Sequence, residues 1–258
     1  MSEQDKSHAE KPRGERLHLI DALRGFSIVS MVGFHFCYDL VYIAGMRLDW
    51  FRPPLEDVWR ASISWTFLAI AGCMCVMSRN NLRRAGKYAA LALAIYVVTS
   101  IAGVDAAISF GIIFCMAAST FIAWLLEKLH ASPKGPGAAL ALFVCFIAFL
   151  HVRAGIVGVG PWRLVLPRWP YEVGLFSWLG FPGPGFVSGD YYPVLPYSLL
   201  FLAGSAMGSW WKERGFPSVF STFRCPPLEA IGRHPLEVYV AHQPLLLAIT
   251  YVVHSTLA

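Results

Sequence analysis

The sequence predicts an all-α protein: a polytopic integral membrane bundle of about seven transmembrane helices, with a cytoplasmic N-terminus and the C-terminus outside. Three observations predict it. The 258 residues are 56% hydrophobic and only 14% charged, whereas soluble domains carry about 25% charged residues. The apolar blocks have the length of about 20 residues that a membrane span requires. Lys and Arg gather in alternate connecting segments, as the positive-inside rule requires.

The elements follow in order from the hydropathy pattern. Residues 1–15 are polar and basic, and we expect a disordered cytoplasmic tail there. Residues 16–258 are expected to form a single transmembrane domain. With the N-terminus inside, fourteen Lys and Arg lie in inner segments and six in outer ones, which favours an odd number of spans. The predicted spans are 19–43, 60–78, 87–104, 107–127, 137–153, 192–211 and 235–254.

Two connections stand out between the predicted spans. Residues 103–107 are so short a link that the third and fourth spans are expected to form a tight helical hairpin. The outer loop 154–191 is long and rich in Gly, Pro and Trp, and such loops are often functional. Its tryptophans have two interpretations, which both stay open: anchors in the membrane interface, or platforms that stack on a sugar ring. They are Trp162, Trp169 and Trp178.

Charge and cysteine usage exclude other classes of function. The net charge is +5, but the basic residues lie beside the spans, so we expect membrane lipid and no nucleic acid as a partner. The six cysteines lie mostly inside apolar segments without the paired spacing of a metal site, and we expect small buried side chains and no metal.

The first predicted span carries four ionisable residues on one face. Asp21, Arg24, His35 and Asp39 lie within the apolar stretch RLHLIDALRGFSIVSMVGFHFCYD. On a helix, Arg24 and His35 lie within roughly 20° of each other and about 16 Å apart along the axis. Each such group costs roughly 2.5–3.5 kcal/mol at mid-bilayer, so we expect the stripe to face protein or a wet cavity. The alternative is structural, with Arg24 snorkelling to the interface and His35 as an interhelical hydrogen-bond partner.

The last predicted span begins with IGRHPLEVYVAHQPLL and carries a second polar group. Gly232 and Pro235 suit a break in the chain followed by a helix start. Tyr239, His242 and Gln243 follow at three- and four-residue spacing, which places them on one helix face. If the first and last spans are neighbours, His242 reaches the cavity of His35. The structural alternative for His242 is an interhelical hydrogen bond.

These segments resemble a known family. IDALRGFSIVSMVGFH is similar to the first helix of the transmembrane acyltransferase superfamily. In that helix an Asp-x-x-Arg element precedes a histidine, and here these residues are Asp21, Arg24 and His35. More specifically, four segments in order resemble the small bacterial relatives of heparan-α-glucosaminide N-acetyltransferase: MVGFHFCYDL, ISFGIIFCMA, SGDYYPVLPYSLLFLAGSAMG and GRHPLEVYVAHQPLL. The chain has fewer spans than the lysosomal enzyme and lacks its lumenal extension, so the acceptor does not carry over.

The resemblance implies acyl transfer from cytoplasmic acyl-CoA, with acetyl-CoA as the expected co-substrate. An imidazole that takes the acceptor's proton contributes about 10²- to 10⁴-fold. His35 is the expected base, with Asp39 as its orienting partner and His242 as a further catalytic residue. The CoA phosphates require cations at the inner mouth, and arginine suits phosphate. The expected donor-binding residues are Arg16, Asp21, Arg24 and Arg233.

The acceptor implied by the resemblance is an amino or hydroxyl group of a saccharide or glycoconjugate on the outer face of a bacterial inner membrane. Its expected binding residues are those at the re-entry of the outer loop and on the last span, namely Asp190, Tyr191, Tyr192, Tyr239 and Gln243. The oligomeric state stays open, with a homodimer as one alternative.

A different class of function also fits the ionisable stripe. The same residues suit a proton-coupled transporter, or a membrane protein that binds a small molecule. The sequence shows no inverted repeat of the kind that many transporters have. His35→Ala distinguishes the two classes, because an enzyme loses turnover while a transporter consumes no thioester at all.

Overall fold

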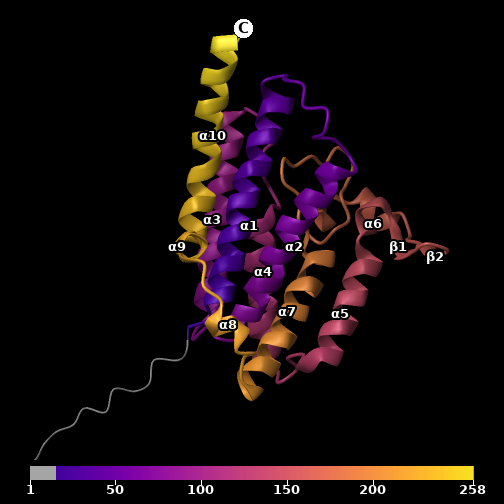
Figure 1. The fold of residues 1–258 in the computed structure, drawn as a ribbon. Coiled ribbons are helices and arrows are strands. Elements are labelled where there is room, and N and C mark those ends of the chain that lie inside the picture. Colours follow the sequence, from indigo (N-terminus) through magenta and orange to yellow (C-terminus); the bar gives the residue numbers. More distant parts are fainter. Residues whose placement is uncertain (1–15, 258) are drawn as a thin grey trace, which may run out of the picture.

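The protein is a bundle of helices (Figure 1) in the computed structural model, which describes residues 16–257. The predicted tail, residues 1–15, lies outside the described residues. The long helices are α1 (His18–Tyr38), which continues as the π-helical turn η1 (Asp39–Ile43), α2 (Leu55–Cys75), α3 (Asn81–Ala102), α4 (Ile112–Lys128), α5 (Gly135–Phe149), α7 (Val194–Arg214) and α10 (Pro235–Leu257).

Short elements lie between the long helices. Between α5 and α7 they are η2 (Val152–Ala154), the strands β1 (Ile156–Val159) and β2 (Trp162–Val165), α6 (Trp169–Glu172) and η3 (Gly174–Phe176). Between α7 and α10 they are α8 (Val219–Thr222) and α9 (Pro226–Gly232). The outer loop of the sequence prediction therefore contains an antiparallel hairpin and two short helices.

Among residues 16–257, five helical segments are long and apolar enough to cross a membrane, so the chain is a multi-pass membrane protein. They are His18–Ile43, Leu55–Cys75, Asn81–Ala102, Gly135–Ala154 and Pro235–Thr256. The other two predicted spans correspond to α4 and α7. Helix α4 has 17 residues, roughly 26 Å, and α7 has ten buried residues, which indicates a central helix that faces protein. The count of seven spans and the orientation of the termini stay predictions.

The centre of the bundle is formed where α2 packs on α7. Leu68 of α2 and Phe201 of α7 are fully buried, and Phe146 of α5 joins them. The backbones approach closely at Gly204, where a Cβ atom would overlap the carbonyl oxygen of Ala69. Small residues permit this approach between membrane helices, and it replaces the hydrophobic driving force that lipid does not supply.

We expect Gly204→Ala to destabilise the protein by about 1–3 kcal/mol, because the added methyl group must push α2 and α7 apart. The measurement is thermal unfolding in detergent, followed by circular dichroism. Gly86→Ala in α3 is the matched control, since a Cβ there would meet no heavy atom within 4 Å. Equal unfolding temperatures for the two variants would contradict the close packing of α2 on α7.

The link between α3 and α4 is longer than the sequence predicts, because α4 begins at Ile112 and not at 107. Gly103 ends α3 in the left-handed conformation, with φ of +59°. The chain that follows is held by the segment before α7: the N–H of Gly189 donates to the carbonyl of Ala107, and that of Tyr192 donates to Phe110. These contacts compete with helix formation, and hydropathy does not reveal them.

Helix α9 packs against the first half of α1, at the end of the bundle opposite the C-terminus (Figure 1). A Cβ on Gly25 would overlap the carbonyl of Leu228, and one on Gly232 would overlap the carbonyl of Asp21. The two glycines therefore let the backbones of α1 and α9 touch. This contact brings the Gly232–Pro235 junction, where α10 begins, beside the arginine of α1.

Candidate functional site

The site consists of two groups of side chains along α1. The first group lies where α1 crosses α10. The rings of His35 and His242 are 5.0 Å apart between centroids, so the first and last long helices are neighbours here. The ring of Tyr239 lies 5.5 Å from that of His242. The structure thus brings together three of the residues that the sequence singled out.

His242 has a defined proton arrangement. Its Nδ1 atom lies 2.5 Å from the carbonyl oxygen of Tyr239. A carbonyl only accepts, so Nδ1 carries a proton, and in the neutral imidazole Nε2 is left as a hydrogen-bond acceptor. This Nε2 is buried and has no hydrogen-bond partner within residues 16–257. A buried hydrogen-bond acceptor without a partner is costly. Such an atom is typical of a site that binds a proton or a ligand.

Asp39 follows His35 by one helical turn and is fully buried at the start of the π-helical turn. Its carboxylate accepts hydrogen bonds from Gln243 Nε2, at 3.0 and 3.2 Å to its two oxygens. In the described part of the chain no hydrogen bond joins Asp39 to His35. The expected orientation of His35 by Asp39 is therefore not seen as a direct contact. Instead, the hydrogen bonds between Asp39 and Gln243 join the end of the first helix to α10 beside the two histidines.

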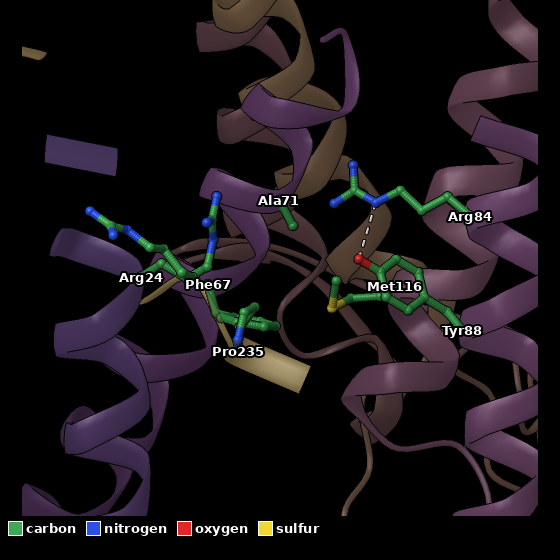
Figure 2. A pocket seen from close by; sticks show the side chains of 8 residues that line it. Arg24, Phe67, Ala71, Arg84, Tyr88, Met116 and Pro235 are labelled. Carbon is green, nitrogen blue, oxygen red and sulfur yellow. Dashed lines mark hydrogen bonds between the residues drawn. The ribbon is translucent and has the colours of Figure 1, made fainter. Parts of the chain in front are cut away.

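The second group lies towards the other end of α1, around a cavity of about 220 Å³ (Figure 2). Arg24 approaches the cavity from α1 and Arg84 from α3. Arg233, at the junction of α9 and α10, is the third arginine that lines it. The cavity is lined by Arg24, Phe67, Ala71, Arg84, Tyr88, Met116, Arg233 and Pro235.

Hydrogen bonds fix two of these arginines. Arg24 donates to the carbonyl of Gly232 at 3.0 Å and to Asp21 at 3.1 Å. Arg84 Nε donates to the hydroxyl of Tyr88 at 3.0 Å, the bond drawn in Figure 2. Arg16 is half exposed, pairs with Asp21 at 3.2 Å and does not line the cavity. Asp21 therefore acts as a shared partner of two arginines, and Arg24 is held in place from two sides.

Arg233 is tied to a buried carboxylate, that of Glu229 in α9. Arg233 donates to Glu229 at 3.3 Å, and His18 Nδ1 lies 2.7 Å from the same oxygen. The hydrogen bond from His18 lowers the pKa of Glu229. Arg224 lies 3.1 Å from His18 Nε2, so His18 links a cation to the carboxylate. This network holds α9 on α1 and places Arg233 at the cavity.

Sequence reasoning missed Arg84 and Glu229. Arg84 belongs to the basic start of α3, where we read it only as a topology signal. Its spacing of four residues from Tyr88, which places both side chains on one helix face, is the signal that could have distinguished it. Glu229 is the isolated acid of α9. Its spacing of four residues from Arg233 is the signal that could have found it, and the packing of α9 on α1 adds His18.

The residues expected to bind the acceptor at the loop re-entry have partners inside the protein. The partly buried Asp190 accepts the N–H of Ile112 at 3.0 Å, at the start of α4. Tyr191 donates to the carbonyl of Ser177 at 2.6 Å, and Tyr192 is buried in the core. Asp190 and Tyr192 hold the end of the loop to the bundle, and Tyr191 joins two segments of the loop. Tyr239 and Gln243 lie at the histidine pair.

Desolvation raises the pKa of Asp190 to about 6. Since this value lies above that of the unfolded chain, the folded protein binds the proton more tightly, and stability falls as pH rises from about 4 to about 6. We expect Asp190→Asn to remove this decline while keeping an oxygen for the Ile112 N–H. Unfolding temperatures between pH 4 and 8 test it, with the exposed Asp49→Asn as control. A decline of the same size in Asp190→Asn would assign it to another group.

One comparison with known proteins identifies the family of the chain. The family model described as heparan-alpha-glucosaminide N-acetyltransferase, catalytic, matches residues 16–244, which include both groups of side chains. Neither the curated proteins nor the solved structures gave a significant match. The match spans well over half of the chain, so this protein belongs to the heparan-alpha-glucosaminide N-acetyltransferase catalytic family.

Proposed function

We propose that the protein is an acetyltransferase of a bacterial inner membrane. It transfers the acetyl group of cytoplasmic acetyl-CoA to an amino or hydroxyl group of a saccharide or glycoconjugate on the opposite face. The observation that carries the proposal is the pairing, along one helix, of an arginine-lined cavity at Arg24 with a histidine pair at His35. Eleven residues, about 16 Å of helix, separate them.

The cavity supplies the donor site in this proposal. Three guanidinium groups suit the phosphates of CoA, because arginine binds phosphate with paired, charge-assisted hydrogen bonds. A volume of about 220 Å³ is below the roughly 300–1,000 Å³ of typical ligand pockets. The cavity therefore receives the phosphate-bearing part of the donor, and the pantetheine arm extends along α1 towards His35.

The histidine pair supplies the base. The acceptor nitrogen or oxygen attacks the thioester carbonyl, a C–N or C–O bond forms, and the C–S bond breaks. His35 takes the proton that the acceptor loses, and that proton leaves with the CoA sulfur as a thiol. The Nε2 atom of His242 is a hydrogen-bond acceptor without a partner among residues 16–257, and His242 positions His35 or the acetylated substrate. Tyr239 and Gln243 complete the binding site of that substrate.

The test is release of CoA thiol by the purified protein in nanodiscs, with acetyl-CoA and a panel of amino sugars and neutral sugars. We expect thiol release that depends on one class of sugar, with equimolar acetylated product identified by mass spectrometry. Acetyl-CoA binding by calorimetry is measured on the same samples. A protein that neither binds nor consumes acetyl-CoA would overturn the proposal and favour transport.

A further inference from the structure

The hairpin β1–β2 packs against α5 through β1, and its strand β2 is exposed along its whole length. Its register pairs Val157 with Leu164 and Val159 with Trp162. Residues paired across two strands share a face, so all four of these side chains lie on one face, and that face is apolar. Trp162 is 85% and Leu164 72% exposed. A two-stranded hairpin is marginal by itself in water. The exposed apolar side chains of β2 therefore favour a further contact, outside the described chain.

The position of the hairpin identifies its surroundings. β1 begins two residues after the membrane-spanning segment Gly135–Ala154 ends, which sets its depth at the membrane interface. Helix α5 exposes Leu140 and Val144, as a helix that borders lipid does. Figure 1 shows the hairpin projecting sideways beyond α5 and α6, away from the rest of the bundle. The space beside it is therefore the headgroup region of the surrounding lipid.

The charges near the hairpin match the same surroundings. Arg163 lies in β2, on the face opposite Trp162, and Arg153 and Arg168 flank the hairpin. All three are exposed, and within residues 16–257 none forms an ion pair. Arginine binds lipid phosphate, and tryptophan favours the level of the headgroups.

We propose that the hairpin β1–β2 is a lipid-binding element that lies in the membrane interface beside α5. Val159, Trp162 and Leu164 enter the boundary between headgroups and acyl chains, while Arg163 and Arg168 bind phospholipid phosphate. The loop is thereby fixed against the bilayer. This inference is independent of the proposed enzymatic activity, because it rests on a segment that contributes no side chain to the histidine pair or to the cavity.

The first experiment measures the surroundings of Trp162. Wild type and Trp162→Phe are reconstituted in nanodiscs of phosphatidylcholine and phosphatidylglycerol, with or without bromine on the upper acyl chain. The fluorescence lost in Trp162→Phe is the signal of Trp162. We expect brominated lipid to quench this signal and aqueous acrylamide to leave most of it. Quenching by acrylamide alone would overturn the proposal, and protection from both quenchers would overturn it in favour of a second protein copy.

The second experiment tests the cations. The double variant Arg163→Gln/Arg168→Gln is compared with Arg47→Gln/Arg52→Gln, a matched pair of exposed arginines in the loop between η1 and α2. Bound phospholipid is counted by native mass spectrometry after purification in mild detergent. We expect the hairpin variant to lose retained lipid and the control to keep it. Equal lipid retention by the two variants would overturn the role of Arg163 and Arg168.

Discussion

His35→Ala is expected to lower acetyl transfer about 10²- to 10⁴-fold, the contribution of a positioned general base, while acetyl-CoA binding is retained. The reason is that the imidazole lies beside His242 in the second half of α1, about 16 Å along the helix from the arginine cavity proposed for the donor. The measurement combines thiol release with calorimetric binding on the same preparation.

Two further variants make this result specific. His254→Ala changes an exposed histidine of α10 and is expected to leave transfer unchanged. His242→Ala removes the neighbouring ring and is expected to lower transfer as well. Its Nε2 is a buried hydrogen-bond acceptor without a partner among residues 16–257, on a ring next to that of His35. Full transfer activity in His35→Ala would exclude this histidine as the base, and a loss of donor binding would move its role to the donor site.

Arg84→Gln is expected to weaken acetyl-CoA binding about 10- to 100-fold, since a hydrogen bond to a charged group contributes roughly 1.5–3 kcal/mol. The turnover rate at saturating donor is expected to stay close to that of wild type, because the proposed role of Arg84 is to bind the phosphates and not the reacting thioester. Steady-state kinetics with acetyl-CoA, over a range of salt concentrations, provide the measurement.

The choice of Arg84 and of the donor sharpens this test. Arg24 also donates to the carbonyl of Gly232, so its replacement would disturb the packing of α9. In the described part of the chain, the side chain of Arg84 donates only to the Tyr88 hydroxyl. Arg83→Gln, an exposed neighbour on α3, is the matched control. Acetyl-pantetheine lacks the nucleotide phosphates, and its use should be insensitive to Arg84→Gln. Equal losses with both donors would mean that Arg84 acts on the fold and not on phosphate.

Hydropathy in the sequence predicted the long helices well, because each membrane-spanning segment must be apolar along its own length. The ends of helices were predicted less well where another segment competes for their backbone. Residues 107–111 read as the start of the fourth span, yet Gly189 and Tyr192 hold this segment by hydrogen bonds and α4 begins at Ile112. Such pairings join residues about 80 positions apart, and no local pattern records them.

The site shows the same division. The stripe of Asp21, Arg24 and His35 was readable because helical periodicity alone sets which residues share a face. The partners of those residues were not readable. Asp39 was expected to orient His35, and its carboxylate instead accepts hydrogen bonds from Gln243, 204 positions away. Asp190 was expected at an open acceptor site, and it caps α4 at Ile112.

The sequence by itself determined the class of this protein, its family and the residues of α1 and α10 that carry ionisable groups. The class and these residues depend on composition and on spacing along one helix, whereas the family rests on the resemblance of whole segments and on the match over residues 16–244. Only the tertiary structure decided that Arg84 completes the arginine cavity, that His242 lies against His35 and that the hairpin β1–β2 projects beyond α5. Those facts depend on which helices become neighbours, and that is set by contacts such as Gly25 with Leu228 and Gly204 with Ala69, where a missing side chain lets two distant segments touch.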